Sequence, residues 1–173
     1  RGQEVRAWYE ASLRQIEKSQ RELLRARILM EKEEDRIFEV RNIRNLFLFT
    51  KSSEPQKTAE RLRGALDGSR VQVFQNGYKV YVLPVGLDKG SAVRRFRDYI
   101  KADRVIAAGD SEFDVPMLEA ADLAYAPKAL AKRCKLGGQV TVIGEDAVFS
   151  DGLLERLCAE LSLWERSDKK TEK

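Results

Sequence analysis

The sequence predicts an α/β protein that combines part of a doubly wound, Rossmann-like parallel sheet with an antiparallel hairpin. Two patterns support this fold class. Between residues 86 and 163, segments with helical spacing of apolar residues alternate with short apolar runs, which is typical of βαβ units. Upstream, two runs of alternating apolar and polar residues flank Asn76-Gly77, a dipeptide favoured in two-residue hairpin turns. The length of 173 residues allows one domain or two small ones.

The N-terminal third is predicted to form a long helix, a strand and a shorter helix. The long helix extends from Glu4 to about Met30, because no proline or glycine interrupts its pattern. Residues 45–50 have the composition of a strand, and Pro55 suits the first turn of a helix that ends near Leu66. The apolar residues at helical spacing in the long helix are Val5, Trp8, Tyr9, Leu13, Ile16, Leu23, Leu24 and Ile28.

The hairpin is the clearest local signal. A two-residue loop at Asn76-Gly77 would fix the register of its strands and leave one mainly apolar, buried face. The predicted pairs on that face are Gln75 with Tyr78, Val73 with Val80, and Val71 with Val82. The opposite face is mixed, so it either meets solvent or faces a site, and its residues are Gln72, Phe74, Lys79 and Tyr81.

The second half contains the alternating elements. Asp88 can cap a helix over residues 89–100, and residues 104–108 are predicted to form a buried parallel strand, because they are continuously apolar from Val105 onward. Residues 164–173 are charged and lack periodicity, which predicts a disordered tail. The other predicted elements are helices at 113–120, 129–134 and 152–163, and strands at 123–126 and 140–143.

Composition argues against several classes of protein. The formal net charge is +4, and basic residues are interspersed with acidic ones, which disfavours a nucleic-acid-binding face. The absence of histidine excludes histidine-ligated zinc and histidine-based triads. Cys134 and Cys158 lack metal-type spacing and fit reduced thiols. Because neither an apolar run of roughly 18 residues nor a signal peptide is visible, we expect a cytoplasmic protein that binds no membrane.

Two aspartates form a candidate metal site. Asp110 follows an apolar strand, at the carboxyl end where open α/β sheets build their sites, and Asp114 lies four residues further on. Two carboxylates at this spacing can converge on Mg²⁺, which takes one or two protein carboxylates and keeps several waters. Alternatively, Asp110 is a turn residue and Asp114 stabilises a helix start. Spacing alone leaves both interpretations open.

Lys89 is a candidate phosphate ligand. It lies in Leu87-Asp88-Lys89-Gly90-Ser91, at a predicted helix start, where a cation is unfavourable. A bound phosphate would explain this placement, because helix N-termini and ammonium groups both attract anions. A surface lysine in a turn is the alternative.

The order of these features resembles the haloacid dehalogenase-like hydrolases. A lysine in a DKG turn precedes a helix, an apolar strand, GDSEFDVPML, and a short strand that ends in Ala-Pro. The sequence is most similar to the Cof-type branch with a large α/β cap, and the resemblance covers roughly residues 45–157. It implies a cap region at residues 1–85 and the C-terminal half of the core at residues 86–163.

The resemblance implies a Mg²⁺-dependent phosphoric monoester hydrolase that acts on a small phosphorylated metabolite. Lys89 would bind the phosphoryl group and the nucleophile, and Asp110 and Asp114 would hold Mg²⁺, with Asp110 binding more directly. The branch often has asparagine where this sequence has Phe113. The mixed face of the hairpin could cover the site, so its residues are candidate substrate contacts or ordinary surface: Gln72, Phe74, Lys79 and Tyr81.

The family's nucleophile has no match in this sequence. That chemistry uses an aspartate that becomes an aspartyl-phosphate, and a second aspartate two residues later as acid and base. No two aspartates here have that spacing. We therefore expect that residue 1 falls within the cap, that this chain alone is inactive, and that it pairs with a missing N-terminal half or with itself, because an incomplete parallel sheet exposes an edge. The alternative is a non-catalytic binding module with the same fold.

Overall fold

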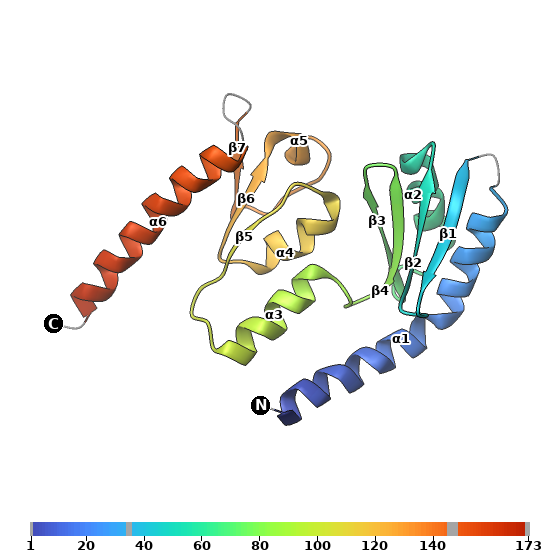
Figure 1. The fold of residues 1–173 in the computed structure, drawn as a ribbon, viewed down its shortest axis with the longest axis horizontal. Coiled ribbons are helices and arrows are strands. Elements are labelled where there is room, and N and C mark those ends of the chain that lie inside the picture. The colour runs from blue at the N-terminus through green and yellow to red at the C-terminus, as the bar shows by residue number, and fades with distance from the viewer. Residues whose placement is uncertain (1, 34–35, 145–148, 172–173) are drawn as a thin grey trace.

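The computed structural model describes residues 2–33, 36–144 and 149–171, with side chains described as far as residue 163. It contains a four-stranded antiparallel sheet and a three-stranded parallel sheet, so the predicted fold class is confirmed. Figure 1 shows the two sheets side by side, and α1 runs from below α3 up along the antiparallel sheet.

The antiparallel sheet belongs to the cap region. Its strand order is β1-β2-β4-β3, formed by Ile37–Ile43, Phe47–Ser52, Lys79–Pro84 and Val71–Asn76. Helices α1 (Gly2–Glu31) and α2 (Pro55–Ala65) both pack on one face of this sheet. The buried cluster between helices and sheet includes Leu23, Ala26, Met30, Leu48, Ala59, Leu62, Val71, Val73, Val80 and Val82. The other face of the sheet carries neither helix.

The sequence does not predict strand β1. Its pairing with β2 is irregular between Ile37 and Glu39, and this irregularity breaks the alternation by which strands are detected. β1 also lies at the sheet edge, where Arg41 and Asn42 are exposed on opposite faces. Because an edge strand can carry polar residues on both faces, its sequence lacks the apolar pattern by which buried strands are recognised.

The predicted register of the hairpin is wrong by two residues. Asn76 pairs with Lys79, so the loop is Gly77-Tyr78 and not Asn76-Gly77. Gly77 has φ +57° at the first loop position, where only glycine adopts this backbone at little cost. A slip of two residues keeps the side chains of the strands on their predicted faces, but Tyr78, predicted on the buried face, lies in the loop and is exposed. The buried face pairs Val71 with Pro84, Val73 with Val82, and Gln75 with Val80.

The parallel sheet contains the three predicted strands of the core half. Its order is β5-β6-β7, formed by Ile106–Ala108, Leu123–Pro127 and Val140–Ile143. In the described part of the chain, β5 pairs only with β6, so its other edge is open. Helices α3, α4 and α5 are Lys89–Ile100, Val115–Ala120 and Lys128–Ala131. The buried side chains of this half include Ala107, Leu118, Ala121, Ala124, Ala126 and Leu130.

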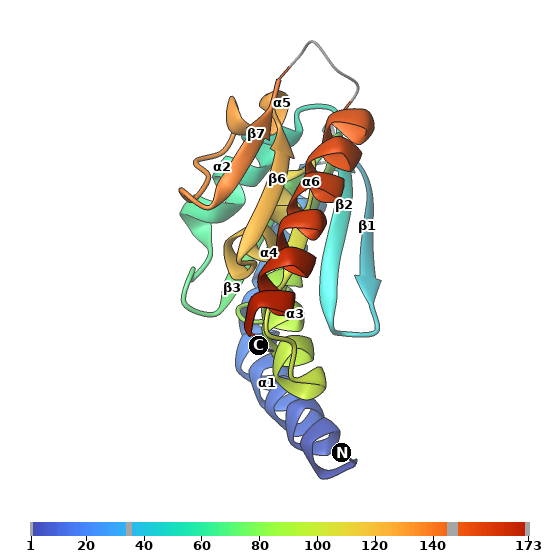
Figure 2. The same ribbon diagram turned by 90° about the vertical axis from the view of Figure 1, so that its left-hand side faces the viewer.

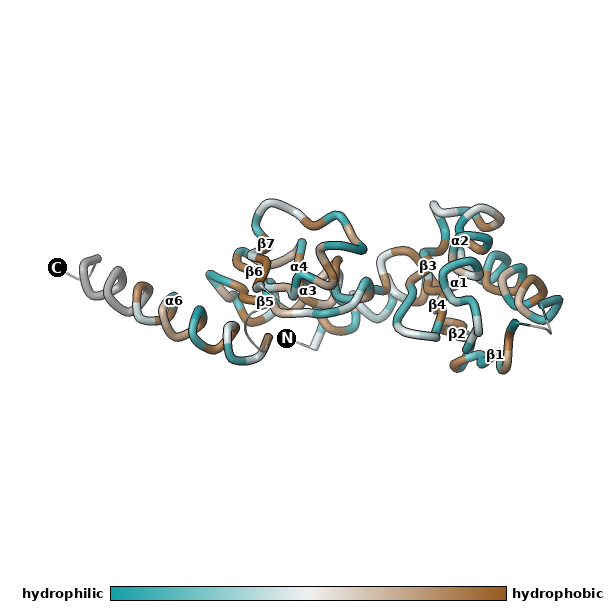
Figure 3. Tube along the Cα trace, turned by 90° about the horizontal axis from the view of Figure 1, so that it is seen from above, coloured by the Kyte–Doolittle hydropathy of each residue, from teal (hydrophilic) through white to brown (hydrophobic). Residues whose placement is uncertain are grey.

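The last helix is longer than the sequence predicts. Helix α6 extends over Phe149–Thr171, so the predicted disordered tail at residues 164–173 is wrong as far as Thr171. Since neither proline nor glycine follows Gly152, nothing in the local sequence stops the helix. Figure 3 shows α6 projecting from the parallel sheet. None of the helices in the described residues combines the length and apolar character of a membrane span.

The two halves also meet through α1. Its N-terminal part lies beside α3 (Figures 1 and 2). There the rings of Trp8 and Tyr99 pack edge to face, with centroids 5.4 Å apart. Arg95 donates a hydrogen bond to the Ser12 hydroxyl at 3.1 Å. One helix therefore contacts both the cap sheet and the core half.

Candidate active site

The start of α3 positions Lys89. Asp88 caps the helix, because its carboxylate accepts a hydrogen bond from the Ser91 backbone at 2.7 Å, and the Ser91 hydroxyl accepts one from the Asp88 backbone at 3.2 Å. Lys89 is the first residue inside the helix. The predicted cap at Asp88 is therefore confirmed, and it fixes the direction in which the lysine leaves the helix.

Two glycines allow close packing next to the candidate residues: Gly90 packs the start of α3 on the start of α4, and Gly109 lies within the loop after β5, which we call the motif loop (residues 109–114). A Cβ at Gly90 would lie 2.1 Å from the carbonyl oxygen of Pro116. A Cβ at Gly109 would lie 2.4 Å from the Cβ of Asp114. Neither position accepts a side chain, so close packing explains the glycines next to Lys89 and Asp110.

Asp114 is the centre of the motif loop. Its side chain is almost fully buried, and Oδ2 accepts hydrogen bonds from the Asp110 backbone at 3.2 Å, the Ser111 backbone at 3.1 Å and the Ser111 hydroxyl at 2.7 Å. Oδ1 accepts a hydrogen bond from Lys89 Nζ. Burial raises the pKa of Asp114, but the bonds from Lys89 and Ser111 outweigh it and hold the pKa below its ordinary value. Asp114 is therefore a buried carboxylate whose charge is stabilised.

Asp110 is exposed at the carboxyl end of β5. Its carbonyl oxygen accepts a hydrogen bond from Arg133 at 3.3 Å, which ties the loop to the end of α5. The structure thus gives the two aspartates different surroundings: the Asp110 carboxylate is open to solvent, whereas both Asp114 oxygens already accept bonds.

These residues fit a magnesium ion that has one direct protein ligand. Within residues 2–33, 36–144 and 149–171, no group of three or more Asp, Glu, Cys or His side chains could hold a metal. Mg²⁺ needs few protein ligands because it retains water and binds substrate oxygens. Asp110 has the open carboxylate for this role, and Asp114 holds the loop that carries it. Direct binding by both aspartates stays a prediction.

Three of the four candidate substrate contacts lie against this site. Gln72 donates to the Asp88 carboxylate at 3.0 Å, next to Lys89. The rings of Phe74 and Tyr81 lie 5.1 Å and 5.4 Å from the ring of Phe113, in the motif loop. The fourth candidate, Lys79, lies closer to the hairpin turn, opposite Lys51 and Asn76. Contact of these residues with a substrate remains a prediction.

Comparisons with known proteins agree with this geometry. Residues 3–135 match the family model of the haloacid dehalogenase-like hydrolases. This chain belongs to that family. A comparison with curated protein sequences gives no match.

Solved structures show the same fold for this haloacid dehalogenase-like chain. The sucrose-phosphatase of Synechocystis sp. PCC6803, solved with sucrose and phosphate, is 15% identical, with a TM-score of 0.55 over 79% of this chain and 64% of that one. A Streptococcus mutans UA159 protein is 20% identical, with a TM-score of 0.54 over 68% of this chain and 45% of that one. The chain thus spans less than two thirds of either structure.

The sequence did not reveal Glu112 and Arg63, which join the two halves. Glu112 accepts hydrogen bonds from the Gln75 backbone at 3.0 Å and from Arg63, and Arg63 also donates to the Val73 carbonyl at 2.9 Å. These partners lie far apart in sequence, so no local pattern marks them. The position of Glu112 between the two aspartates of the motif was the one available signal.

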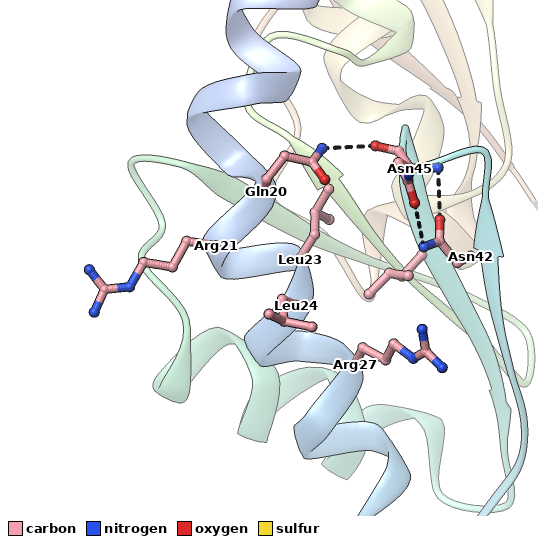
Figure 4. A pocket seen from close by; sticks show the side chains of 8 residues that line it. Gln20, Arg21, Leu23, Leu24, Arg27, Asn42 and Asn45 are labelled. Atoms are coloured by element: carbon pink, nitrogen blue, oxygen red, sulfur yellow. Dashed lines mark hydrogen bonds between the residues drawn. The ribbon is translucent and has the colours of Figure 1, made fainter.

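A separate pocket lies on the helix-covered side of the cap sheet (Figure 4). Gln20 on α1 donates to the Asn45 carbonyl at 2.9 Å, and Asn42 donates to the Asn45 side chain at 2.8 Å. Arg44 and Asn45 have φ of 49° and 58°, so these bonds support a strained turn between β1 and β2. We assign this pocket a structural role. Its other lining residues are Arg21, Leu23, Leu24, Arg27 and Leu48.

Proposed function

We propose that this haloacid dehalogenase-like hydrolase is a Mg²⁺-dependent phosphatase that cleaves phosphoric monoesters of small metabolites. The observation that supports this most strongly is the hydrogen bond of Lys89, at the start of α3, to Asp114 in the motif loop, next to the open carboxylate of Asp110. A cation and an exposed carboxylate are thus held on one short loop and one helix start. The Synechocystis relative is a phosphatase by name.

Lys89 is suited to bind a phosphoryl group. Its side chain is 45% exposed although Asp114 holds its ammonium group, so it can reach a ligand without losing its position. It also lies where the backbone N–H groups at the start of a helix attract anions. A cation already held in place stabilises charge on phosphoryl oxygens at little cost in reorganisation.

Asp110 would hold Mg²⁺, which neutralises negative charge on the phosphoryl oxygens when bound. Asp114 acts through its hydrogen bonds: it fixes the backbone of Asp110 and Ser111, and it orients the Lys89 ammonium group. Asp114 is therefore a positioning residue in this proposal, and Asp110 is the metal ligand.

The nucleophilic aspartate would come from outside these 173 residues. The open edge of β5 lies directly before Asp110, so a further parallel strand added there would place its own carboxyl end next to Asp110. We propose that this strand comes from an N-terminal half of the protein or a separate chain, and that the present chain alone does not hydrolyse phosphate esters.

Replacement of Lys89 tests the proposal. In protein that carries the strand with the nucleophile, Lys89→Met should lower kcat/KM for p-nitrophenyl phosphate by about 100-fold or more, because a preorganised charge is lost. Lys135→Met, at an exposed lysine after α5, is the matched control and should retain activity. Equal activity of both variants, with unchanged thermal midpoints, would remove Lys89 from the site.

A further inference from the structure

One row of side chains crosses all four strands of the cap sheet, on the face without helices. The register pairs Arg41 on β1 with Phe49 on β2, Phe49 with Tyr81 on β4, and Tyr81 with Phe74 on β3. The Phe49 and Tyr81 ring centroids are 5.6 Å apart, and the Arg41 guanidinium lies 5.8 Å from the Phe49 centroid. We call these four residues the aromatic row.

The aromatic row is partly open. Phe49 and Tyr81 are half-buried, whereas their strand neighbours Leu48, Val80 and Val82 are buried against α1 and α2. Phe74, at the end of the row, is only 8% exposed, so it offers little surface to a ligand. Two half-buried rings side by side form a flat apolar surface on this face, and the adjacent row of the same face continues it with Ile43, Phe47 and Leu83.

Phe113 joins this row to the candidate active site. Its ring lies 5.1 Å from Phe74 and 5.4 Å from Tyr81, and Lys89 Nζ lies 5.4 Å from its centroid. A continuous line of rings therefore runs from Lys89 to Arg41 through Phe113, Tyr81 and Phe49. At this position in the motif loop a polar residue would end the line, and phenylalanine extends it.

We propose that the aromatic row binds the leaving group of the phosphate ester, and that this leaving group contains a flat aromatic ring. The proposal rests on the proposed phosphatase function, which places the phosphoryl group at Lys89. The adjacent surface consists of ring faces, and an aromatic ring that stacks on them gains binding free energy. A sugar or polyol would lose water from its hydroxyl groups over Phe49 and Phe113, which offer no hydrogen bonds in return.

Charges next to the row agree with an anionic aromatic ligand. Arg41 lies at the far end, and Lys51 and Lys79 form the neighbouring cross-strand pair towards the hairpin turn. Lys89, which is paired with Asp114, lies at the other end, and Lys51 and Lys79 border the rings along one side. Glu39, the strand neighbour of Lys51, forms an ion pair with Arg41, so within the described residues the unopposed cations beside the rings are Lys51 and Lys79.

Calorimetric binding to this chain tests the proposal without requiring catalysis. The ligands are 2-naphthyl phosphate and glycerol 1-phosphate, each in Mg²⁺ buffer, and 2-naphthol without phosphate. Phe49→Leu and Tyr81→Leu retain apolar volume but remove the ring. Each should therefore raise the Kd for 2-naphthyl phosphate roughly 10-fold, because stacking on the ring is lost. Binding of glycerol 1-phosphate should not change. Phe38→Leu, at an exposed ring on β1 outside the row, is the matched control.

The outcomes separate this proposal from the proposed function. If 2-naphthyl phosphate and 2-naphthol bind equally well and Phe49→Leu weakens the binding of both, the aromatic row binds aromatic rings but Lys89 binds no phosphoryl group. If both phosphate esters bind equally well and Phe49→Leu changes the Kd of neither, the phosphate site is supported and the role of the aromatic row is overturned. Equal weakening of both esters, or no binding of either naphthyl compound, also overturns the proposal.

Discussion

Asp114 shows how single residues organise the site. It is 5% exposed, yet it keeps a charge because four donor groups surround its two oxygens. The chain gains from this arrangement only if the carboxylate stays ionised. The acidic motif therefore stabilises its own loop as well as supplying an exposed ligand at Asp110.

Asp114→Asn should destabilise the chain in a pH-dependent manner. The pKa of Asp114 in the folded state lies below its ordinary value of about 3.9, so its contribution is fully present above that value and is lost as the pH falls through the folded-state pKa. At pH 7 we expect the free energy of unfolding to fall by about 1–3 kcal/mol, because an amide cannot satisfy the same donors. Urea unfolding at pH 7 and pH 3 measures this difference.

The difference between wild type and Asp114→Asn should shrink at pH 3. Asp98→Asn, at an exposed position on α3, is the control and should change stability little at either pH. A loss of the same size at both pH values would show that the charge of Asp114 does not stabilise the loop.

The sequence predicted which helix start or strand end carries each site residue, but it did not predict which side chains these residues contact. The spacing of Lys89, Asp110 and Asp114 placed each at a helix start or strand end. That Asp114 turns inward depends on the 3₁₀ turn at Glu112–Asp114, which the motif did not indicate. Contacts of Phe113 with Phe74 and Tyr81 join residues about 30–40 positions apart, and one sequence gives no signal for such pairs.

At the scale of elements, the sequence predicted the strands that are buried on both faces or on one face only. Continuous apolar runs revealed β5, β6 and β7, and strict alternation revealed β3 and β4, because burial determines these patterns. β1 was missed because its pairing is irregular and its edge position tolerates polar residues. The hairpin register depended on which residue takes the positive φ at the turn, and Gly77 occupies the first loop position.

The open edge of β5 should make this chain associate. Its backbone groups lack a strand partner on that side within the described residues, and large apolar side chains around the core half are exposed, including Phe96, Val142 and Leu154. Light scattering should give a mass above 19.8 kDa, or a mass that falls to that of a one-to-one complex when the N-terminal half is added. A stable monomer whose measured mass does not change when the N-terminal half is added would contradict this prediction.

At the scale of the whole molecule, the site depends on how the cap region meets the core half. Glu112 and Phe113 hold the cap sheet over the motif loop, and α1 contacts both halves. Because these contacts join distant parts of the sequence, local patterns predicted the two halves but not their junction. The same junction places the helix-free face of the cap sheet next to Lys89.

The account depends most on Asp110 as the residue that holds Mg²⁺ beside a phosphoryl group. The most direct test is the Mg²⁺ dependence of p-nitrophenyl phosphate hydrolysis by Asp110→Asn, in protein that carries the strand with the nucleophile. We predict a loss of 100-fold or more in kcat/KM, since the metal's charge stabilisation disappears. The control is Asp103→Asn, at an exposed position before β5, which should behave as wild type. Full Mg²⁺-dependent activity in Asp110→Asn would contradict the account.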